Sequence, residues 1–141
     1  MSDPRLEFDH VHIIAEDPEA AAAWYRDMLG GEITGSHQVR NAAQISVDFG
    51  GTIIVIRGQR PGERPGRKND LKSFEDYVSH DQWGTDHFGF RVHGEIIAFC
   101  DGLQAKGAEF SVEPYEFLPG RTIAYLKAPD GVTIELVPAG D

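Results

Sequence analysis

One pattern occurs twice in this sequence of 141 residues. DHVHI at residues 9–13 returns as DHFGF at residues 86–90, an offset of 77 residues. The same offset carries GGEI at residues 30–33 onto GAEF at residues 107–110. Self-similarity at a fixed spacing indicates one supersecondary unit built twice. The chain is therefore expected to fold as two similar modules in tandem.

Each copy predicts a strand, a helix and then three strands. In the first copy residues 6–15 alternate as a strand does, Asp17 is a suitable helix N-cap followed by Pro18, and Gly30 and Gly31 end the helix. The other predicted elements are a strand over residues 87–93, a helix over 95–106 that ends at Gly107, and strands over 32–38, 42–49, 52–57, 109–114, 122–128 and 132–138. The predicted fold is α+β, with two tandem βαβββ modules.

A single domain over residues 1–141 is expected, with the first module at about 5–58 and the second at about 84–139. The segment between them, about 59–83, begins with a stretch rich in proline and glycine, and one or two helical turns are predicted around 71–78. Connections of this length are uncommon inside a domain. The segment is either a lid over a site or a flexible linker, and the sequence leaves both open.

Composition argues against several kinds of partner. The formal net charge is −10 and the nearest basic cluster, residues 57–68, is interleaved with Gly, Pro and Glu, so nucleic acid is not an expected partner. Cys100 is the single cysteine, and the sequence shows no signal peptide and no long apolar run. We therefore expect a cytoplasmic protein that does not associate with membranes. A chain of this length needs no metal to stabilise its core, so a bound metal would be functional.

Period-two alternation assigns the side chains of each predicted strand to two faces. In the first strand of each copy the apolar residues that pack on the helices share one face. His10 and His12 of the first copy, and His87 of the second, lie on the opposite face. These histidines are therefore expected to point toward the space that the sheets enclose.

The last strand of each copy adds two further positions on that face. GTIIVI at residues 51–56 matches GVTIEL at residues 131–136 at an offset of 80, which predicts a hairpin about three residues longer in the second copy. In each of these strands the alternation places the apolar packing residues on one face and a central residue, Val55 or Glu135, on the opposite face. The repeat thus predicts four equivalent interior positions, occupied by His10, Val55, His87 and Glu135.

Two histidines and one carboxylate at such positions suggest a metal site. A histidine on a strand is by itself more often a hydrogen-bonded structural residue, and Glu135 alone is explained by an ion pair with Arg91 or Arg121. Together, His10, His87 and Glu135 form a set of two histidines and one carboxylate, which leaves coordination positions open. Such donors suit iron(II), manganese, zinc, cobalt or nickel.

The segments DHVHIIAEDPEAAAAWYRDMLGGE and DHFGFRV…KAPDGVTIELVP resemble the two halves of a vicinal oxygen chelate protein, the superfamily of glyoxalases, bleomycin resistance proteins and extradiol dioxygenases. The resemblance covers nearly the whole chain except residues 58–83. It implies that the two modules form a U-shaped, partly open mixed β-barrel with the helices outside and a divalent metal inside. It also implies a homodimer that acts on a small-molecule substrate, with the site within one chain or across two.

Within the superfamily the chain resembles the extradiol ring-cleaving dioxygenases best. Their metal ligands match His10, His87 and Glu135, and their active-site tyrosine matches Tyr125. The resemblance thus implies a metal-dependent enzyme, with iron(II) favoured, that cleaves the ring of a substrate chelating through vicinal oxygens. Glyoxalase I-like lyases and epimerases use a fourth ligand at the position of Val55, and valine supplies none.

Other functions stay open at this point. The dioxygenases place a catalytic histidine near residues 50–53, where this chain has none; His12 is a replacement acid or base, or merely lines the pocket. One alternative is a lyase, isomerase or thiol transferase that uses the same metal, with His12 or Tyr125 as proton carrier. Another is a metal-free drug-binding protein, similar to bleomycin resistance proteins, in which the predicted ligands only form hydrogen bonds.

Overall fold

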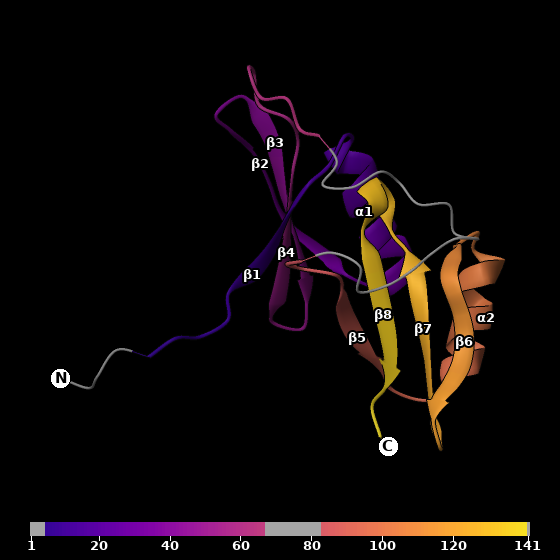
Figure 1. Ribbon diagram of the computed structural model, residues 1–141. Coiled ribbons are helices and arrows are strands. Elements are labelled where there is room, and N and C mark those ends of the chain that lie inside the picture. The colour runs from indigo at the N-terminus through magenta and orange to yellow at the C-terminus, as the bar shows by residue number, and fades with distance from the viewer. Residues whose placement is uncertain (1–4, 67–82, 141) are drawn as a thin grey trace. The chain divides into compact units, whose positions relative to one another are not determined.

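Each half of the chain forms one four-stranded sheet with one helix in the computed structural model, which describes residues 5–66 and 83–140 (Figure 1). The chain divides into two units, Met1–Gly66 and Arg67–Asp141. The predicted βαβββ order is confirmed in both units. The helical turns predicted around residues 71–78 lie outside the described residues.

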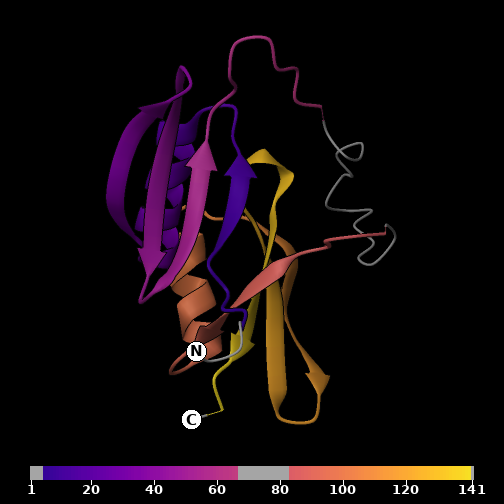
Figure 2. The ribbon, with the colours of Figure 1, turned by 90° about the vertical axis from the view of Figure 1, so that its left-hand side faces the viewer.

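The first unit contains a mixed sheet and a single long helix. Its elements are β1 (His10–Ile14), α1 (Pro18–Leu29), β2 (Glu32–Val39), β3 (Ala42–Phe49) and β4 (Thr52–Arg57). The strand order is β1-β4-β3-β2, in which β1 runs parallel to β4 and the other neighbours are antiparallel. Helix α1 packs against β3 and β4, behind the sheet in the view of Figure 2. The core between them includes Ala21, Ala22, Tyr25, Ile45, Val47, Ile54 and Ile56.

The boundaries of α1 follow from its terminal residues. The Asp17 side chain accepts a hydrogen bond from the Ala20 amide at 3.0 Å, as the predicted N-cap should. Gly30 ends the helix with φ of 77°, a conformation that glycine adopts without steric cost. Gly31 is needed for a different reason, because an added Cβ would lie 2.5 Å from the Val47 side chain. The glycine pair therefore stops the helix and lets the chain turn closely onto the sheet.

The second unit repeats this architecture. Its elements are β5 (Phe88–Val92), α2 (Ile96–Ala105), β6 (Phe110–Leu118), β7 (Arg121–Lys127), a short 3-10 turn (Pro129–Gly131) and β8 (Thr133–Pro138). The strand order is β5-β8-β7-β6, with β5 parallel to β8. Helix α2 packs against β8. Buried apolar residues of the two include Cys100, Leu103, Ile134 and Leu136.

Two strands differ from the prediction by more than one residue at one end. β1 begins at His10, several residues later than predicted, because its pairing with β4 starts with His10 opposite Ile53. Phe8 is 73% exposed and lies outside β1, two residues before its start. β6 is longer than predicted, because its pairing with β7 continues until Leu118 lies opposite Arg121 at the hairpin.

The extra residues of the second module lie in a single connection. Gly50 and Gly51 join β3 to β4, whereas residues 128–132, which contain the 3-10 turn, join β7 to β8. The second connection is therefore three residues longer, and the predicted longer hairpin of the second copy is confirmed.

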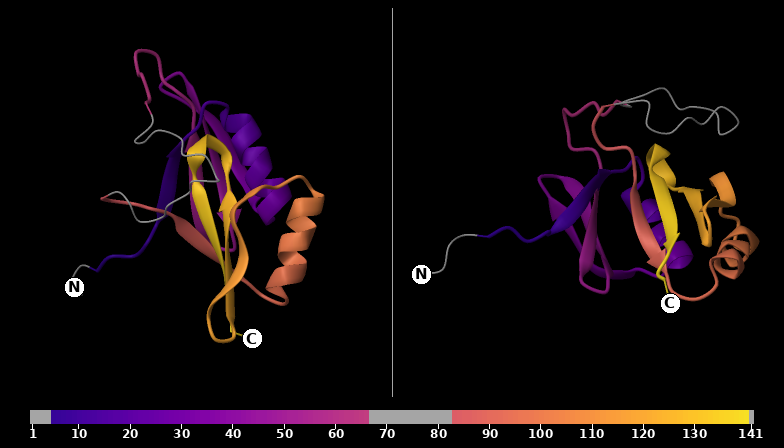
Figure 3. Two further views of the ribbon diagram at one scale, coloured as in Figure 1. Left: turned by 45° about the vertical axis from the view of Figure 1, so that its right-hand side comes forward. Right: turned by 60° about the horizontal axis from the view of Figure 1, so that its bottom comes forward.

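The strands of the described residues form two separate mixed sheets that are not closed into one barrel. The α+β class and the two-module architecture are confirmed. Figure 3 gives two further views, in which the β6–β7 hairpin and α2 of the second unit are easily followed. Neither helix of the described part is both long and apolar enough to cross a membrane.

Candidate metal centre

Three of the predicted site residues lie together in the second unit. His87 immediately precedes β5, Glu135 is in β8, and Tyr125 of β7 is the cross-strand partner of Glu135. His87 Nε2 lies 3.3 Å from Glu135 Oε1, and the His87 and Tyr125 rings meet edge to face with centroids 5.1 Å apart. The side chains of His87 and Glu135 are 18% and 21% exposed, and Tyr125 is buried. The second sheet thus gathers an imidazole, a carboxylate and a phenol on one face.

Gly89 lets β5 approach β8 closely at Glu135. It lies opposite Glu135 in the parallel pair of β5 and β8. A Cβ at residue 89 would lie 3.0 Å from the Glu135 carbonyl oxygen and 3.4 Å from the Glu135 Cβ. In the first unit the equivalent pair is His12 opposite Val55. The ionisable side chain of each pair therefore comes from the last strand in the second unit and from the first strand in the first unit.

Asp86 is a further member of the cluster that sequence reasoning missed. Its Oδ2 lies 2.6 Å from His87 Nδ1, on the other side of the ring from Glu135, and its side chain is 24% exposed. The imidazole is therefore flanked by two carboxylates, one at each nitrogen. The signal for Asp86 in the sequence is the Asp-His pair, which occurs at Asp86-His87 and again at Asp9-His10. From the sequence alone, this pair was used only to identify the repeat.

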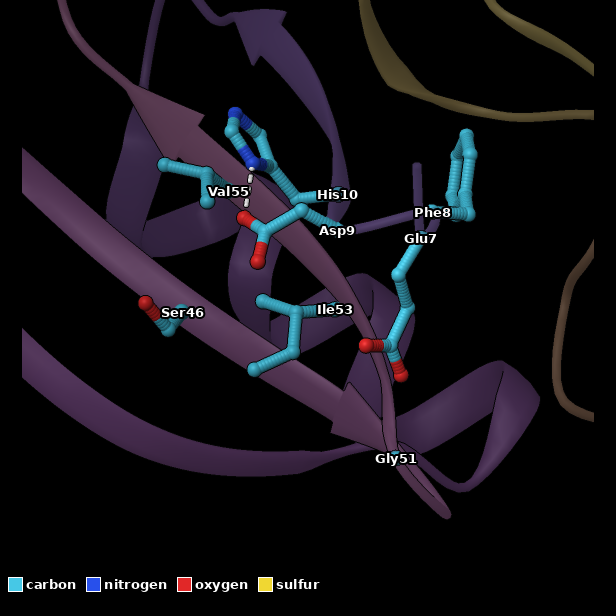
Figure 4. Close-up of a pocket in the computed structure, with 8 residues that line it drawn as sticks. All are labelled: Glu7, Phe8, Asp9, His10, Ser46, Gly51, Ile53 and Val55. Carbon is cyan, nitrogen blue, oxygen red and sulfur yellow. Dashed lines mark hydrogen bonds and ion pairs between the residues drawn. The ribbon is translucent and has the colours of Figure 1, made fainter. Parts of the chain in front are cut away.

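His10 occupies the equivalent place in the first unit. It begins β1 and, with Val55 and Ser46, lines an open hollow of about 470 Å³ (Figure 4). Its Nδ1 lies 2.6 Å from Asp9 Oδ2, as in the second unit. Water reaches this pair more easily, because the His10 and Asp9 side chains are 41% and 91% exposed. Val55 faces the hollow without any donor atom, as the repeat predicts.

His12 is the second predicted catalytic residue. Its ring meets the His10 ring edge to face at a centroid distance of 6.1 Å. Partial burial lowers the pKa of His12, and the positive charges of Arg57 and, less strongly, His10 and Arg60 lower it further. The neutral imidazole, which accepts a proton, is therefore the predominant form near neutral pH.

Arg57 is buried at the end of β4, and a carboxylate balances its charge. It donates hydrogen bonds to the Gly58 carbonyl at 3.1 Å and to Glu63 Oε1 at 2.7 Å. The hydrogen bond from Arg57 lowers the pKa of Glu63, with a smaller contribution from the Arg60 amide. This ion pair fastens residues 58–63, the start of the predicted insert, to the first unit.

The donors in the second unit suit a divalent cation. His87 Nε2 and Glu135 Oε1 lie 3.3 Å apart, and imidazole nitrogen and carboxylate oxygen are both common ligands of such metals. Neither Arg91 nor Arg121 pairs with Glu135 in the described part of the chain. Three His, Cys, Asp or Glu side chains grouped as a metal site are not found among the described residues.

The family model of the Glyoxalase/Bleomycin resistance protein/Dioxygenase superfamily matches residues 7–136. The chain belongs to this superfamily. No curated protein sequence matches this superfamily member. Its two-module fold is thus that of a known superfamily, which contains metal-dependent enzymes.

Several solved structures are similar to this superfamily member. A glyoxalase family protein from Bacillus cereus is 16% identical, with 96% of this chain and 95% of that one covered and a TM-score of 0.76. A fosfomycin resistance protein from Listeria monocytogenes, complexed with manganese(II) and sulfate, is 15% identical, with coverage of 94% and 92% and a TM-score of 0.63. A lactoylglutathione lyase from Agrobacterium tumefaciens is 16% identical, with coverage of 97% and 96% and a TM-score of 0.63. At these identities the likeness shows the fold.

Proposed function

We propose that this chain is a divalent-metal-dependent enzyme in which His10, His87 and Glu135 bind the metal. The observation that carries the proposal is the approach of His87 Nε2 to Glu135 Oε1 on the polar face of the second sheet. Glu135 is only 21% exposed and has no arginine partner among residues 5–66 and 83–140, which favours a cation beside it. His10 is the proposed third ligand because the repeat makes it the equivalent of His87. We further propose a cytoplasmic homodimer.

The proposed substrate is a small molecule that chelates the metal through two adjacent oxygen atoms, such as a catechol. Two histidines and one carboxylate leave coordination positions for it, since Val55 supplies no fourth donor. The metal, iron(II) by preference, would act as a Lewis acid and template for the substrate oxygens. In the proposed reaction the aromatic ring is cleaved next to the hydroxyls, and both atoms of dioxygen enter the product.

The side chains beside the proposed ligands have complementary roles in proton transfer. Tyr125 contacts the His87 ring and lies directly opposite Glu135. We therefore propose that its hydroxyl exchanges a proton with a substrate oxygen. His12 is the proposed general base, because its lowered pKa keeps it unprotonated near neutral pH. Tyr125→Phe and His12→Gln should therefore lower kcat with little change in metal affinity.

Metal binding is tested first, because every version of the enzyme depends on it. Protein loaded anaerobically with iron(II), and separately with manganese, zinc, nickel or cobalt, is assayed for metal content and dissociation constant. We expect one metal per chain and an affinity at least about tenfold weaker in Glu135→Gln. Glu113→Gln, an exposed residue of β6, removes the same charge and serves as the matched control. Full affinity in Glu135→Gln would contradict the ligand assignment.

The reaction is tested with the metal-loaded protein. Oxygen uptake and a ring-fission chromophore with a panel of catechols would support the dioxygenase. The absence of both across the panel would refute that version. Metal-dependent turnover without oxygen uptake would instead indicate proton transfer or thiol addition, the alternative that the Tyr125–His87 contact also favours. Absence of metal together with tight binding of an aromatic drug would indicate a metal-free binding protein.

A further inference from the structure

Each module places an aspartate directly before the histidine that is proposed to bind metal. The contacts are alike, because Asp86 Oδ2 lies 2.6 Å from His87 Nδ1 and Asp9 Oδ2 lies 2.6 Å from His10 Nδ1. Their surroundings differ. The Asp86 and His87 side chains are 24% and 18% exposed, whereas those of Asp9 and His10 are 91% and 41% exposed.

These contacts determine which ring nitrogen carries the proton. An ionised carboxylate only accepts hydrogen bonds, so the nitrogen beside it must be the donor. For His87 two carboxylates compete, since Asp86 lies 2.6 Å from Nδ1 and Glu135 lies 3.3 Å from Nε2. The shorter contact is that of a charge-assisted hydrogen bond, whereas the longer one is at the weak end of the range. The neutral ring is therefore protonated on Nδ1, and its Nε2 lone pair points toward Glu135.

We propose that Asp86 is a positioning residue that holds His87 in the Nδ1-protonated tautomer and presents Nε2 to a divalent cation shared with Glu135. The cation is that of the proposed function, on which this part of the inference rests; the effect on the tautomer does not depend on it. A hydrogen bond at the second nitrogen fixes the orientation of a ligating imidazole and raises its basicity. Asp9 acts in the same way on His10, but more weakly, because water competes at the exposed pair.

Two readouts test the role of Asp86. The first is the ¹⁵N shifts of the His87 ring in metal-free protein at alkaline pH, with the signals assigned by comparison with His87→Gln. The second is the dissociation constant for manganese(II) or zinc(II), measured by competition with a chelator dye. The variants are Asp86→Asn, Asp86→Ala and Asp9→Ala. Asp101→Asn, an exposed residue of α2 in the same unit, is the matched control.

The Asp86→Asn variant distinguishes a residue that fixes the His87 tautomer from one that only fills space. The asparagine amide is nearly the same size as the carboxylate but has an NH₂ group that donates to an unprotonated Nδ1, which moves the ring proton to Nε2. We expect the Nδ1-protonated form in the wild type, the Nε2-protonated form in Asp86→Asn, and affinities about 10–100-fold weaker in both Asp86 variants. Asp9→Ala should weaken binding less than Asp86→Ala, and Asp101→Asn should leave it unchanged.

The outcomes separate this inference from the proposed function. A wild-type His87 protonated on Nε2, or a tautomer unchanged in Asp86→Asn, would overturn the positioning role. Wild-type metal affinity in Asp86→Asn would also overturn the positioning role, because that is the result expected of a residue that only fills space. A wild type that binds no metal but whose tautomer changes in Asp86→Asn would support the role of Asp86 at the ring and refute the proposed enzyme.

Discussion

Replacing Gly89 by alanine should weaken metal binding with little effect on folding. The added Cβ would lie 3.0 Å from the Glu135 carbonyl oxygen, where ordinary contact begins at 3.4 Å. The Glu135 backbone must therefore give by a few tenths of an ångström, whereas ligand distances in metal sites lie within about 0.2 Å of their usual values. We expect the affinity to fall roughly tenfold or more, as when supporting contacts of a ligand are lost. Alanine is better than glycine in a strand by about 0.5–1 kcal/mol, which offsets part of the strain.

The assay compares metal affinity with stability in the same variants. Affinity is measured by competition with a chelator dye, and the free energy of unfolding by urea titration of the metal-free protein, which should change by less than about 1 kcal/mol. Gly102→Ala is the control, because an added Cβ on α2 has no atom within 4 Å. That variant should be more stable by about 0.5–1 kcal/mol and should bind metal normally. A folded Gly89→Ala protein with wild-type affinity would refute the reasoning.

Further predictions concern the core, an ion pair and the cysteine. Leu136→Ala, in a fully buried position of β8, should lower the free energy of unfolding by about 2–5 kcal/mol in urea titrations; a loss below 1 kcal/mol would contradict its core role. Glu63, whose pKa is lowered by Arg57, contributes stability above its unfolded pKa of 4.5 that disappears as pH falls through its lower folded pKa. Glu63→Gln should therefore be less stable at neutral pH and lose less on acidification, and thermal unfolding curves parallel to the wild type from neutral to acidic pH would count against this. Burial raises the pKa of Cys100 to about 11, so iodoacetamide should label it slowly unless the protein is unfolded in urea, and rapid labelling of native protein would disprove its burial.

The order of elements and the polar faces of the strands were predictable, because repeats and period-two alternation are local signals. The start of β1 was not, since Phe8 fits the alternation but has no strand beside it, and strand pairing is a tertiary property. The approach of His87 to Glu135 follows from the repeat together with the register of β5 and β8.

The role of Asp86 was not predictable from alternation. Adjacent residues of a strand point to opposite faces, so an aspartate beside a strand histidine is not expected to touch it. Asp86 and His87 both precede β5, which begins at Phe88, and this backbone is free of the strand pleat. Asp9 likewise lies just before the first residue of β1. The contact therefore depends on where each strand begins, which is the least certain part of a prediction from sequence.

The parallel pairing of β5 with β8 also affects how the second module folds. His87 and Glu135 are 48 residues apart and meet only when the first and last strands of the module have come together. Such non-local contacts form late and slow the folding of a chain. A cation bound by both side chains would bind only the folded module and would therefore stabilise it. The stabilisation would be about 2.7 kcal/mol when the concentration of free cation is a hundred times the dissociation constant. Metal supply would then govern the lifetime of this half of the protein as well as its chemistry.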